Sequence, residues 1–309
     1  MRILVFGAGV LGSLYAARLK QAGQEVTILA RGARAEEIRQ HGIVLEDETT
    51  GTRTETRLPV ISELAVDDCY DVILVLVRRD QIDSTLPQLA ANRSPSVVFM
   101  ANNASGPSGL VDALGEGRVL LGFAGAGGAR EGHVVRCRVV SAQTQPTTLG
   151  ELSGQVTPRL EAITAALQQA GFPTAFSANI DAWLKTHAVG VVPIAGAMYF
   201  AGDNYKLAAS KDGLYLMIRA FREGVRALMA LGIPVEPAKF KVLRWIPAWF
   251  LAILLRRIFA TKRAELVMWR HAAHARGEME LLADDVRALM RRAGRPTPAF
   301  DRLFPEVKR

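Results

Sequence analysis

The run Arg2-Ile3-Leu4-Val5-Phe6-Gly7-Ala8-Gly9-Val10-Leu11-Gly12 decides the fold of the first half of this 309-residue chain. Residues 2–6 are typical of a buried strand, and residues 11–22 have the apolar spacing of a helix. The turn between them has the pattern GxGxxG, in which the glycines permit a tight turn, close approach of a pyrophosphate and close helix–sheet packing. This context predicts a dinucleotide-binding loop made of Gly7, Ala8, Gly9, Val10, Leu11 and Gly12.

Apolar runs of strand length continue through the first half of the chain. The candidate strands are Arg2–Phe6, Glu25–Leu29 and residues 72–77, 97–100, 119–122, 134–140 and 147–150. Helix-length segments separate the first five of them, which indicates a parallel sheet covered on both faces.

The second half of the chain has a different composition. Residues 158–170 are helical, residues 171–176 form a break, and from residue 179 onwards almost every segment has a helical pattern. The sequence therefore predicts an α/β fold with a Rossmann domain over residues 1–174. An all-helical domain over residues 175–309 is expected to bind the substrate and to mediate any dimerisation.

The end of the second predicted strand indicates which dinucleotide binds. NAD enzymes usually place Asp or Glu there to bind the ribose 2′-hydroxyl. This chain has Arg31 there, with Arg34 three residues later and no acidic residue before Glu36. Because a guanidinium can hold a 2′-phosphate with two hydrogen bonds and a carboxylate would repel it, the sequence favours NADPH over NADH.

The net charge of +8 is unevenly distributed. Residues 1–240 contain 23 basic and 23 acidic side chains, whereas residues 241–309 contain 15 basic and seven acidic ones. A basic domain surrounded by nucleic acid would not show this pattern, so we expect no nucleic-acid partner. The two cysteines exclude a disulfide scaffold and lack the spacing of a zinc site.

The apolar stretch of residues 245–255 is the longest in the chain and is too short to span a membrane, which needs about 20 residues. Together with the absence of a secretory signal near the start, it predicts a cytoplasmic protein. Pro247 and basic flanks leave two interpretations of this stretch. It is either a bent helix pair in the core or a dimer interface, or an anchor at a membrane surface.

The sequence resembles the ketopantoate reductase (2-dehydropantoate 2-reductase) family over essentially its full length. The matching motifs are the glycine loop, Leu29-Ala30-Arg31-Gly32, Gly42-Ile43, residues 122–132, Trp183-Leu184-Lys185, Gly277-Glu278-Met279-Glu280 and residues 294–298. The resemblance implies a second domain like that of 6-phosphogluconate dehydrogenase. It also implies NADPH-dependent reduction of a 2-oxo acid, the activity that the family supplies to pantothenate biosynthesis.

The resemblance also implies roles for individual residues. Lys185 matches the proton donor of the family, and Glu278 matches a carboxylate near the nicotinamide and substrate. The further residues implied to contact the cofactor are Arg78, Asn103 and Gly127, and Asn204 is the further residue implied to contact the substrate.

The departures from the family pattern concern the substrate. The family carries asparagines four and eight residues after its lysine, where this chain has Val189 and Pro193, and a family serine falls on Leu266. These changes make the expected pocket more apolar and ketopantoate itself doubtful. Three alternatives therefore remain: an imine- or opine-type reductase, a hydroxy-acid dehydrogenase, and a non-catalytic NADPH sensor.

Histidines provide two further hypotheses. His271, His274 and Glu278 share one helix face, but three ligands spread over two turns cannot converge on one ion, so no metal is expected. We expect His271 to line the pocket or an interface, and His187 to be structural.

Overall fold

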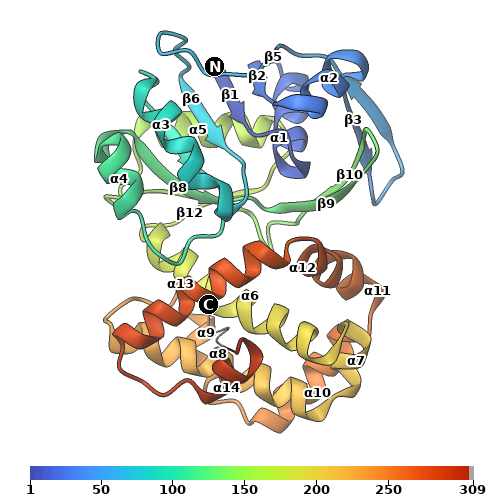
Figure 1. Cartoon of the computed structure of the whole chain (residues 1–309), viewed down its shortest axis with the longest axis vertical. Helices are drawn as coiled ribbons and strands as arrows, with labels where there is room; N and C mark the ends of the chain where they lie inside the picture. The colour runs from blue at the N-terminus through green and yellow to red at the C-terminus, as the bar shows by residue number, and fades with distance from the viewer. Residues whose placement is uncertain (306–309) are drawn as a thin grey trace. The chain divides into compact units, whose positions relative to one another are not determined.

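The computed structural model of the chain (Figure 1) describes residues 1–305, except the side chains of Leu266, Val267, His271 and His274. The chain forms two compact units. The sheet unit contains Met1–Ala101 and Pro107–Ile180. The helical unit contains the short segment Asn102–Gly106 and the chain from Asp181 onwards.

The sheet unit is built on an eight-stranded sheet with the order β12-β11-β8-β7-β6-β1-β2-β5. The five predicted parallel strands are all present and adjacent. They are β1 (Arg2–Phe6), β2 (Glu25–Leu29), β6 (Val72–Val75), β7 (Val97–Phe99) and β8 (Val119–Phe123). Their side chains are buried almost throughout, as expected for strands covered on both faces.

The remaining strands of this sheet lie at its edges. β11 (Thr147–Glu151) pairs antiparallel with β8, and β12 (Thr174–Phe176) pairs parallel with β11. At the other edge, β5 (Val60–Ile61) pairs with β2. The sequence predicts a break over residues 171–176, but pairing with β11 makes part of this segment a strand. The sheet unit consequently extends to Ile180 rather than ending at residue 174.

A second sheet of four strands has the order β4-β3-β10-β9. It contains β4 (Arg53–Thr56), β3 (Ile43–Asp47), β10 (Val134–Val139) and β9 (Ala126–Glu131). Of these, only β10 is predicted from the sequence. β9 and β10 form a hairpin, and Gly132 in its turn has a φ of 57°, a conformation that favours glycine.

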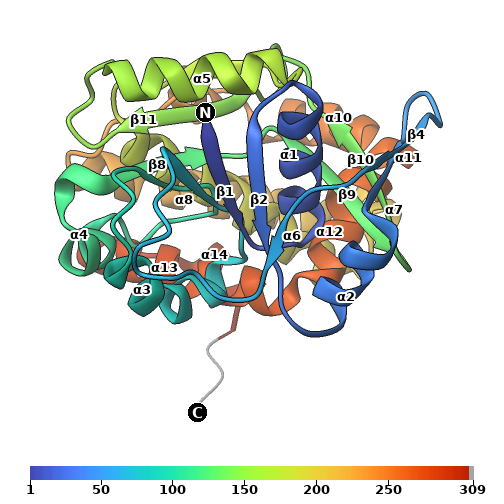
Figure 2. The same ribbon diagram turned by 90° about the horizontal axis from the view of Figure 1, so that it is seen from above.

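Helices cover both faces of the main sheet (Figure 2). α1 (Val10–Gln21) and α5 (Pro158–Gln169) pack against each other, and so do α3 (Ile82–Ala91) and α4 (Ser108–Leu114). The sheet unit also contains α2 (Gly32–His41), η1 (Arg79–Gln81) and η2 (Glu116–Arg118). On α1, the Tyr15 ring stacks on Phe172 with centroids 4.0 Å apart, and its hydroxyl lies 2.6 Å from Thr147 Oγ1.

The described part of the helical unit contains ten helical segments and a shared apolar core. They are α6 (Ile180–Ala201), α7 (Asn204–Ala209), α8 (Lys211–Ala230), α9 (Lys239–Leu243), α10 (Ala248–Phe259), α11 (Lys262–Ala264), the π-helical turn η3 (Glu265–Trp269), α12 (Arg270–His274), α13 (Arg276–Arg292) and α14 (Pro298–Leu303). The core is lined by Val192, Met198, Leu228, Leu282 and Phe300, among others. The α/β fold with a parallel sheet and a helical C-terminal part is confirmed.

Candidate active site

The glycine loop joins β1 to α1, and two of its positions admit no side chain. Gly7 has a φ of 110°, and a Cβ there would lie 2.8 Å from the carbonyl oxygen of Leu76. A Cβ at Gly12 would lie 1.9 Å from the carbonyl oxygen of Gly7. The close contact of the first turn of α1 with the loop therefore depends on Gly12, and the contact of the loop with the residues after β6 depends on Gly7.

The third glycine of the loop faces open space. Gly9 is the N-cap of α1, receives no side-chain cap, and has no atom within 4 Å of a Cβ built on it. The first backbone N–H groups of a helix have no intrahelical acceptor, and the helix dipole adds positive potential there. The loop thus offers unpaired donors and room for the phosphates of a dinucleotide.

Arg34 of α2 holds this loop in place. Its Nε donates to the carbonyl oxygen of Ala8 at 3.1 Å, and its Nη2 donates to Ser13 Oγ at 2.8 Å. The remaining nitrogen, Nη1, donates to Glu37 at 2.6 Å. The sequence does not predict this role of Arg34, because spacing alone does not show that its guanidinium folds back onto the loop.

Two exposed arginines follow the strands on either side of β1. Arg31 is the N-cap of α2 just after β2, and its Nη2 donates to Gln88 Oε1 at 3.1 Å. Arg78 follows β6 and pairs with Asp80, with Nε and Oδ1 3.2 Å apart. Since β2 and β6 both pair in parallel with β1, the glycine loop and both arginines lie at the same edge of the sheet. Ligands of doubly wound folds bind at this carboxyl edge.

Gly127, the remaining predicted cofactor residue of the sheet unit, lies in a different place. It is exposed on β9 and pairs with Arg138 of β10 in the second sheet. Its predicted contact with the cofactor stays a prediction.

The segment Asn102–Gly106 follows β7 and forms a turn that belongs to the helical unit. Asn103 is buried, and its side chain closes this turn. Its Oδ1 accepts from the backbone N–H of Gly106 and from Ser105 Oγ, both at 3.0 Å, and its Nδ2 donates to the Gly106 carbonyl at 3.1 Å. The amide of Asn103 is thus occupied in shaping the turn.

The neighbouring Asn102 points to a predicted catalytic group instead. Its Nδ2 lies 3.5 Å from Oε1 of Glu278, which is buried in the first turn of α13. Within the described part of the chain, Asn102 Oδ1 is buried without a hydrogen-bond partner. The resemblance implies a role for Asn103 rather than for Asn102. The geometry makes Asn102 the better candidate for contact with a ligand.

Lys185 projects from α6 and lies against the same turn. Its side chain is only 10% exposed, and its ammonium forms an ion pair with Asp181, one helical turn earlier. A Cβ built on Gly106, whose φ is 94°, would lie 3.3 Å from Lys185 Nζ and 3.6 Å from Asp181 Oδ1. The turn therefore contacts Lys185 through Gly106 and Glu278 through Asn102, which brings an ammonium, a carboxylate and an unpaired amide oxygen into one site.

Residues 3–154 match the family model described as ketopantoate reductase PanE/ApbA. This part of the chain belongs to the ketopantoate reductase family.

Curated relatives extend the similarity to most of the chain. The 2-dehydropantoate 2-reductase of Pyrococcus horikoshii is 25% identical over 252 residues, which cover 79% of this chain and 78% of that protein. An uncharacterised oxidoreductase of Bacillus subtilis is 21% identical over 243 residues, or 77% of this chain and 78% of that protein. The ketopantoate reductase family consists of oxidoreductases that act on small oxo acids.

Solved structures share the fold of both units. The 2-dehydropantoate 2-reductase of Geobacter metallireducens superimposes with a TM-score of 0.79 at 18% identity, covering 98% of this chain and 97% of that one. D-mandelate dehydrogenase in complex with NADH and anilino(oxo)acetate gives a TM-score of 0.77 at 17% identity, with 98% and 96% coverage. Both structures thus share the fold of this chain over 98% of its length.

The helix face beyond Lys185 departs from the ketopantoate reductase family pattern. Val189 and Pro193 are both buried, and Val189 packs so closely on α8 that a Cβ at Gly224 would lie 2.4 Å from its Cγ1. Neither side chain can donate or accept a hydrogen bond at these positions.

The structure gives Asn204 a structural contact away from Lys185. Asn204 is fully buried, and its Nδ2 donates to the carbonyl oxygen of Phe259 at 2.8 Å, which ties α7 to the end of α10. The side chains of His271 and His274 lie outside the described residues. Their predicted roles therefore stay predictions, and the side chains that are described contain no group of three metal-ligating residues.

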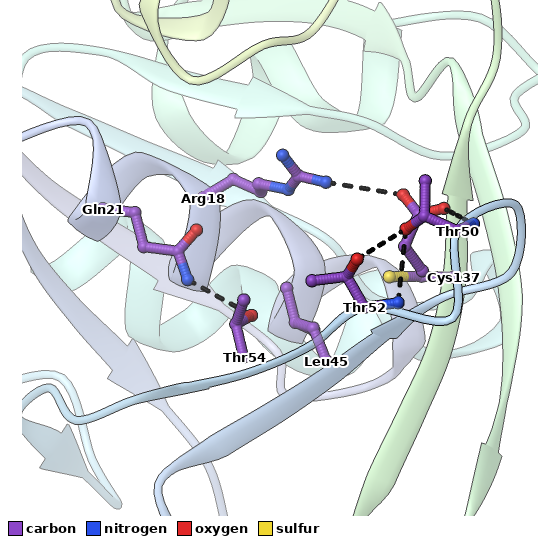
Figure 3. A pocket seen from close by; sticks show the side chains of 8 residues that line it. Arg18, Gln21, Leu45, Thr50, Thr52, Thr54 and Cys137 are labelled. Carbon is purple, nitrogen blue, oxygen red and sulfur yellow. Dashed lines mark hydrogen bonds and ion pairs between the residues drawn. The ribbon is translucent and has the colours of Figure 1, made fainter.

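A hollow of about 300 Å³ opens at the end of α1 remote from the glycine loop (Figure 3). Arg18 and Gln21 line it together with threonines of residues 50–54 and the buried Cys137. Arg18 pairs with Asp47 at 3.7 Å. Burial raises the pKa of the Cys137 thiol to about 11, so it stays protonated and weakly nucleophilic at neutral pH. The hollow contains none of the residues implied in catalysis.

His187 makes the stability of the protein depend on pH. Its ring stacks on Trp183 with centroids 5.3 Å apart, and burial lowers the pKa of His187 to about 4. In the unfolded chain the pKa is about 6.5, so the unfolded state binds more protons between these values. We expect the unfolding free energy to fall by roughly 3 kcal/mol as the pH drops from about 6.5 to 4.

Chemical denaturation at several pH values measures this contribution. His187→Gln has no titrating ring and should show a shallower slope in this window, whatever its stability at pH 8. Equal slopes for both proteins would contradict the assignment.

Proposed function

We propose that this protein is an NADPH-dependent reductase that converts a small 2-oxo acid to the corresponding 2-hydroxy acid in the cytoplasm. The observation that carries the proposal is the Asn102–Gly106 turn, which contacts Lys185 on one side and Glu278 on the other. The glycine loop and Arg31 support the cofactor assignment, because unpaired amides and an exposed guanidinium fit a dinucleotide that carries a 2′-phosphate.

The reaction needs a hydride and a proton. The glycine loop and Arg31 would hold NADPH, which would supply the hydride for the carbonyl carbon. Lys185 donates a proton from Nζ to the carbonyl oxygen, and its positive charge stabilises the alkoxide as it develops. Asp181 holds the ammonium in position on its own helix. Glu278 and the unpaired amide oxygen of Asn102 would orient the substrate or the nicotinamide by accepting hydrogen bonds from it.

The substrate that fits this site has an apolar side chain. Val189 and Pro193 continue the α6 face on which Lys185 lies, and neither can hydrogen-bond to a substrate hydroxyl. An apolar site rejects an added hydroxyl only weakly, so we expect turnover of ketopantoate as well, with a lower kcat/KM than for 2-oxo acids that have apolar side chains. The D-mandelate dehydrogenase likeness supports 2-oxo acids with an aromatic side chain as the first class to test.

NADPH oxidation with a panel of 2-oxo acids, with and without amines, tests this function. We expect turnover without amines and the highest kcat/KM for apolar or aromatic side chains. Turnover only with amines would indicate imine reduction instead. Tight NADPH binding with no consumption against the whole panel would indicate a sensor.

The cofactor preference makes a separate prediction. Arg31→Ala should raise the KM for NADPH by about 10- to 100-fold and leave that for NADH nearly unchanged, because only NADPH carries the phosphate that Arg31 binds. Arg39→Ala, at an exposed arginine near the end of the same helix, is the matched control. A wild-type preference for NADH, or an unchanged KM for NADPH in Arg31→Ala, would contradict this role.

A further inference from the structure

The segment of residues 237–264, which contains α9 and α10, combines positive charge with exposed aromatic side chains. It holds seven basic residues and no acidic one, and Glu236 and Glu265 flank it. We refer to it as the α9–α10 segment. It includes the stretch whose two interpretations the sequence leaves open.

One face of α10 accounts for its packing in the helical unit. Leu251, Ala252 and Phe259 are buried, and the helix contacts α7 and α8. Figure 1 shows α10 at the edge of the helical unit, beside α7. This inner face provides the apolar contacts that hold the helix to the unit.

The outer face of the same helix is also apolar. Two rows at four-residue spacing run along it, as neighbours on a helix surface do. The first row is Trp249, Ile253 and Arg257, and the second is Phe250, Leu254 and Ile258; all six are exposed. The rings of Trp249 and Phe250 lie 5.8 Å apart at 89°. An exposed apolar face of this extent is unusual for a surface that meets only water.

The residues before α10 extend this surface. Trp245 is 75% exposed, and the guanidinium carbon of Arg244 lies 4.7 Å from the centroid of its ring. At the other end of α10, Arg256 and Arg257 are exposed in the last turn. The exposed tryptophans thus lie between cationic groups, an arrangement typical of helices in the headgroup region of a bilayer.

We propose that the α9–α10 segment docks the protein on the surface of an anionic phospholipid bilayer. α10 would lie in the plane of the interface, with its outer face among the acyl chains and its arginines at the phosphates. No helix in the described part of the chain is long and apolar enough to cross a membrane. A segment with no acidic residue complements anionic lipid, whereas two copies of it facing each other would bring like charges together.

Sedimentation of the full-length protein with lipid vesicles tests the proposal. We expect binding to vesicles of phosphatidylcholine with phosphatidylglycerol, much weaker binding to phosphatidylcholine alone, and release at high salt because screening weakens the charge contribution. Tryptophan fluorescence should shift to shorter wavelength on binding, since Trp245 and Trp249 leave water.

Paired variants separate the apolar and the charged contributions. Trp245→Ser with Trp249→Ser should weaken binding about tenfold or more, since two large apolar side chains no longer insert. Arg256→Gln with Arg257→Gln should weaken it about fivefold for each arginine. All four positions are exposed, so the variants should unfold at the same temperature as the wild type.

Matched controls remove equivalent groups elsewhere. Val156→Ser with Phe200→Ser removes two exposed apolar side chains, and Arg93→Gln with Arg295→Gln removes two exposed charges outside the α9–α10 segment. Both controls should bind like the wild type. Absence of binding to anionic vesicles, or equal losses in controls and variants, would overturn the proposal. A dimer in analytical ultracentrifugation that Trp245→Ser with Trp249→Ser abolishes would assign the surface to a second copy instead.

Discussion

Replacing Lys185 by methionine is expected to lower kcat by about a thousandfold while leaving the affinity for NADPH nearly unchanged. The loss follows from the proposed role, because general acid catalysis by a positioned side chain contributes typically 10²- to 10⁴-fold. The glycine loop and Arg31, which lie in the sheet unit, remain intact in this variant. Single-turnover and steady-state rates measure kcat, and quenching of protein fluorescence measures NADPH affinity.

Lys185→Arg distinguishes a loss of activity caused by the missing proton donor from one caused by unfolding. Methionine leaves the carboxylate of Asp181 without its ion pair, whereas arginine can retain it. Arginine stays protonated at all relevant pH values and is therefore a poor proton donor. We expect Lys185→Arg to fold and bind NADPH but to turn over slowly. Lys206→Met, at an exposed lysine of the helical unit, should behave like the wild type. Full activity of Lys185→Arg, or loss of NADPH binding with normal turnover at saturation, would contradict the role.

Alanine substitutions at two glycines of the loop are expected to separate stability from cofactor binding. Gly12→Ala places a Cβ 1.9 Å from the carbonyl oxygen of Gly7, so either α1 or the loop must shift. We expect it to lower the unfolding free energy by about 3 kcal/mol or more and the melting temperature by roughly 10 °C. Thermal unfolding followed by circular dichroism measures this effect.

Gly9→Ala should give the opposite pattern. Its backbone, with a φ of −71°, suits alanine, and no atom lies within 4 Å of the new Cβ, so the melting temperature should stay near that of the wild type. The methyl group would occupy the space where the phosphates approach, which should weaken NADPH binding about tenfold or more. Wild-type affinity in Gly9→Ala would mean that the dinucleotide does not approach this loop.

The parallel strands could be predicted because their environment leaves a strong pattern in the sequence. Strands such as β6 and β7 are covered on both faces, so every residue in them is apolar. β9 and β4 lack this pattern, because β9 reads Ala-Gly-Gly-Ala-Arg-Glu and β4 reads Arg-Thr-Glu-Thr. Such segments become strands through pairing with a partner that is remote in the sequence, and a local pattern cannot show that pairing.

In the candidate site, too, sequence motifs indicate single residues, whereas the contacts between residues that are remote in the sequence appear only in the structure. Resemblance to the family identified Lys185 and Glu278 by their sequence context, and the structure shows that one turn contacts both. Which of Asn102 and Asn103 closes that turn cannot be read from the sequence, because both are asparagines. The hydrogen bond of Arg34 to the glycine loop cannot be read from it either, because it depends on the direction of a side chain. Asn204 lies at a position that resembles a substrate-binding motif, but in the structure its side chain donates a hydrogen bond to the carbonyl oxygen of Phe259.

The Asn102–Gly106 turn also limits how the protein can be divided. A fragment that begins at Asp181 would contain the helices of the second unit but not the five residues that lie against Lys185 and Glu278. An exchange of helical halves between relatives would meet the same difficulty, since the turn is encoded within the other half. A substitution in these five residues therefore affects the helical unit, although the first half of the gene encodes them.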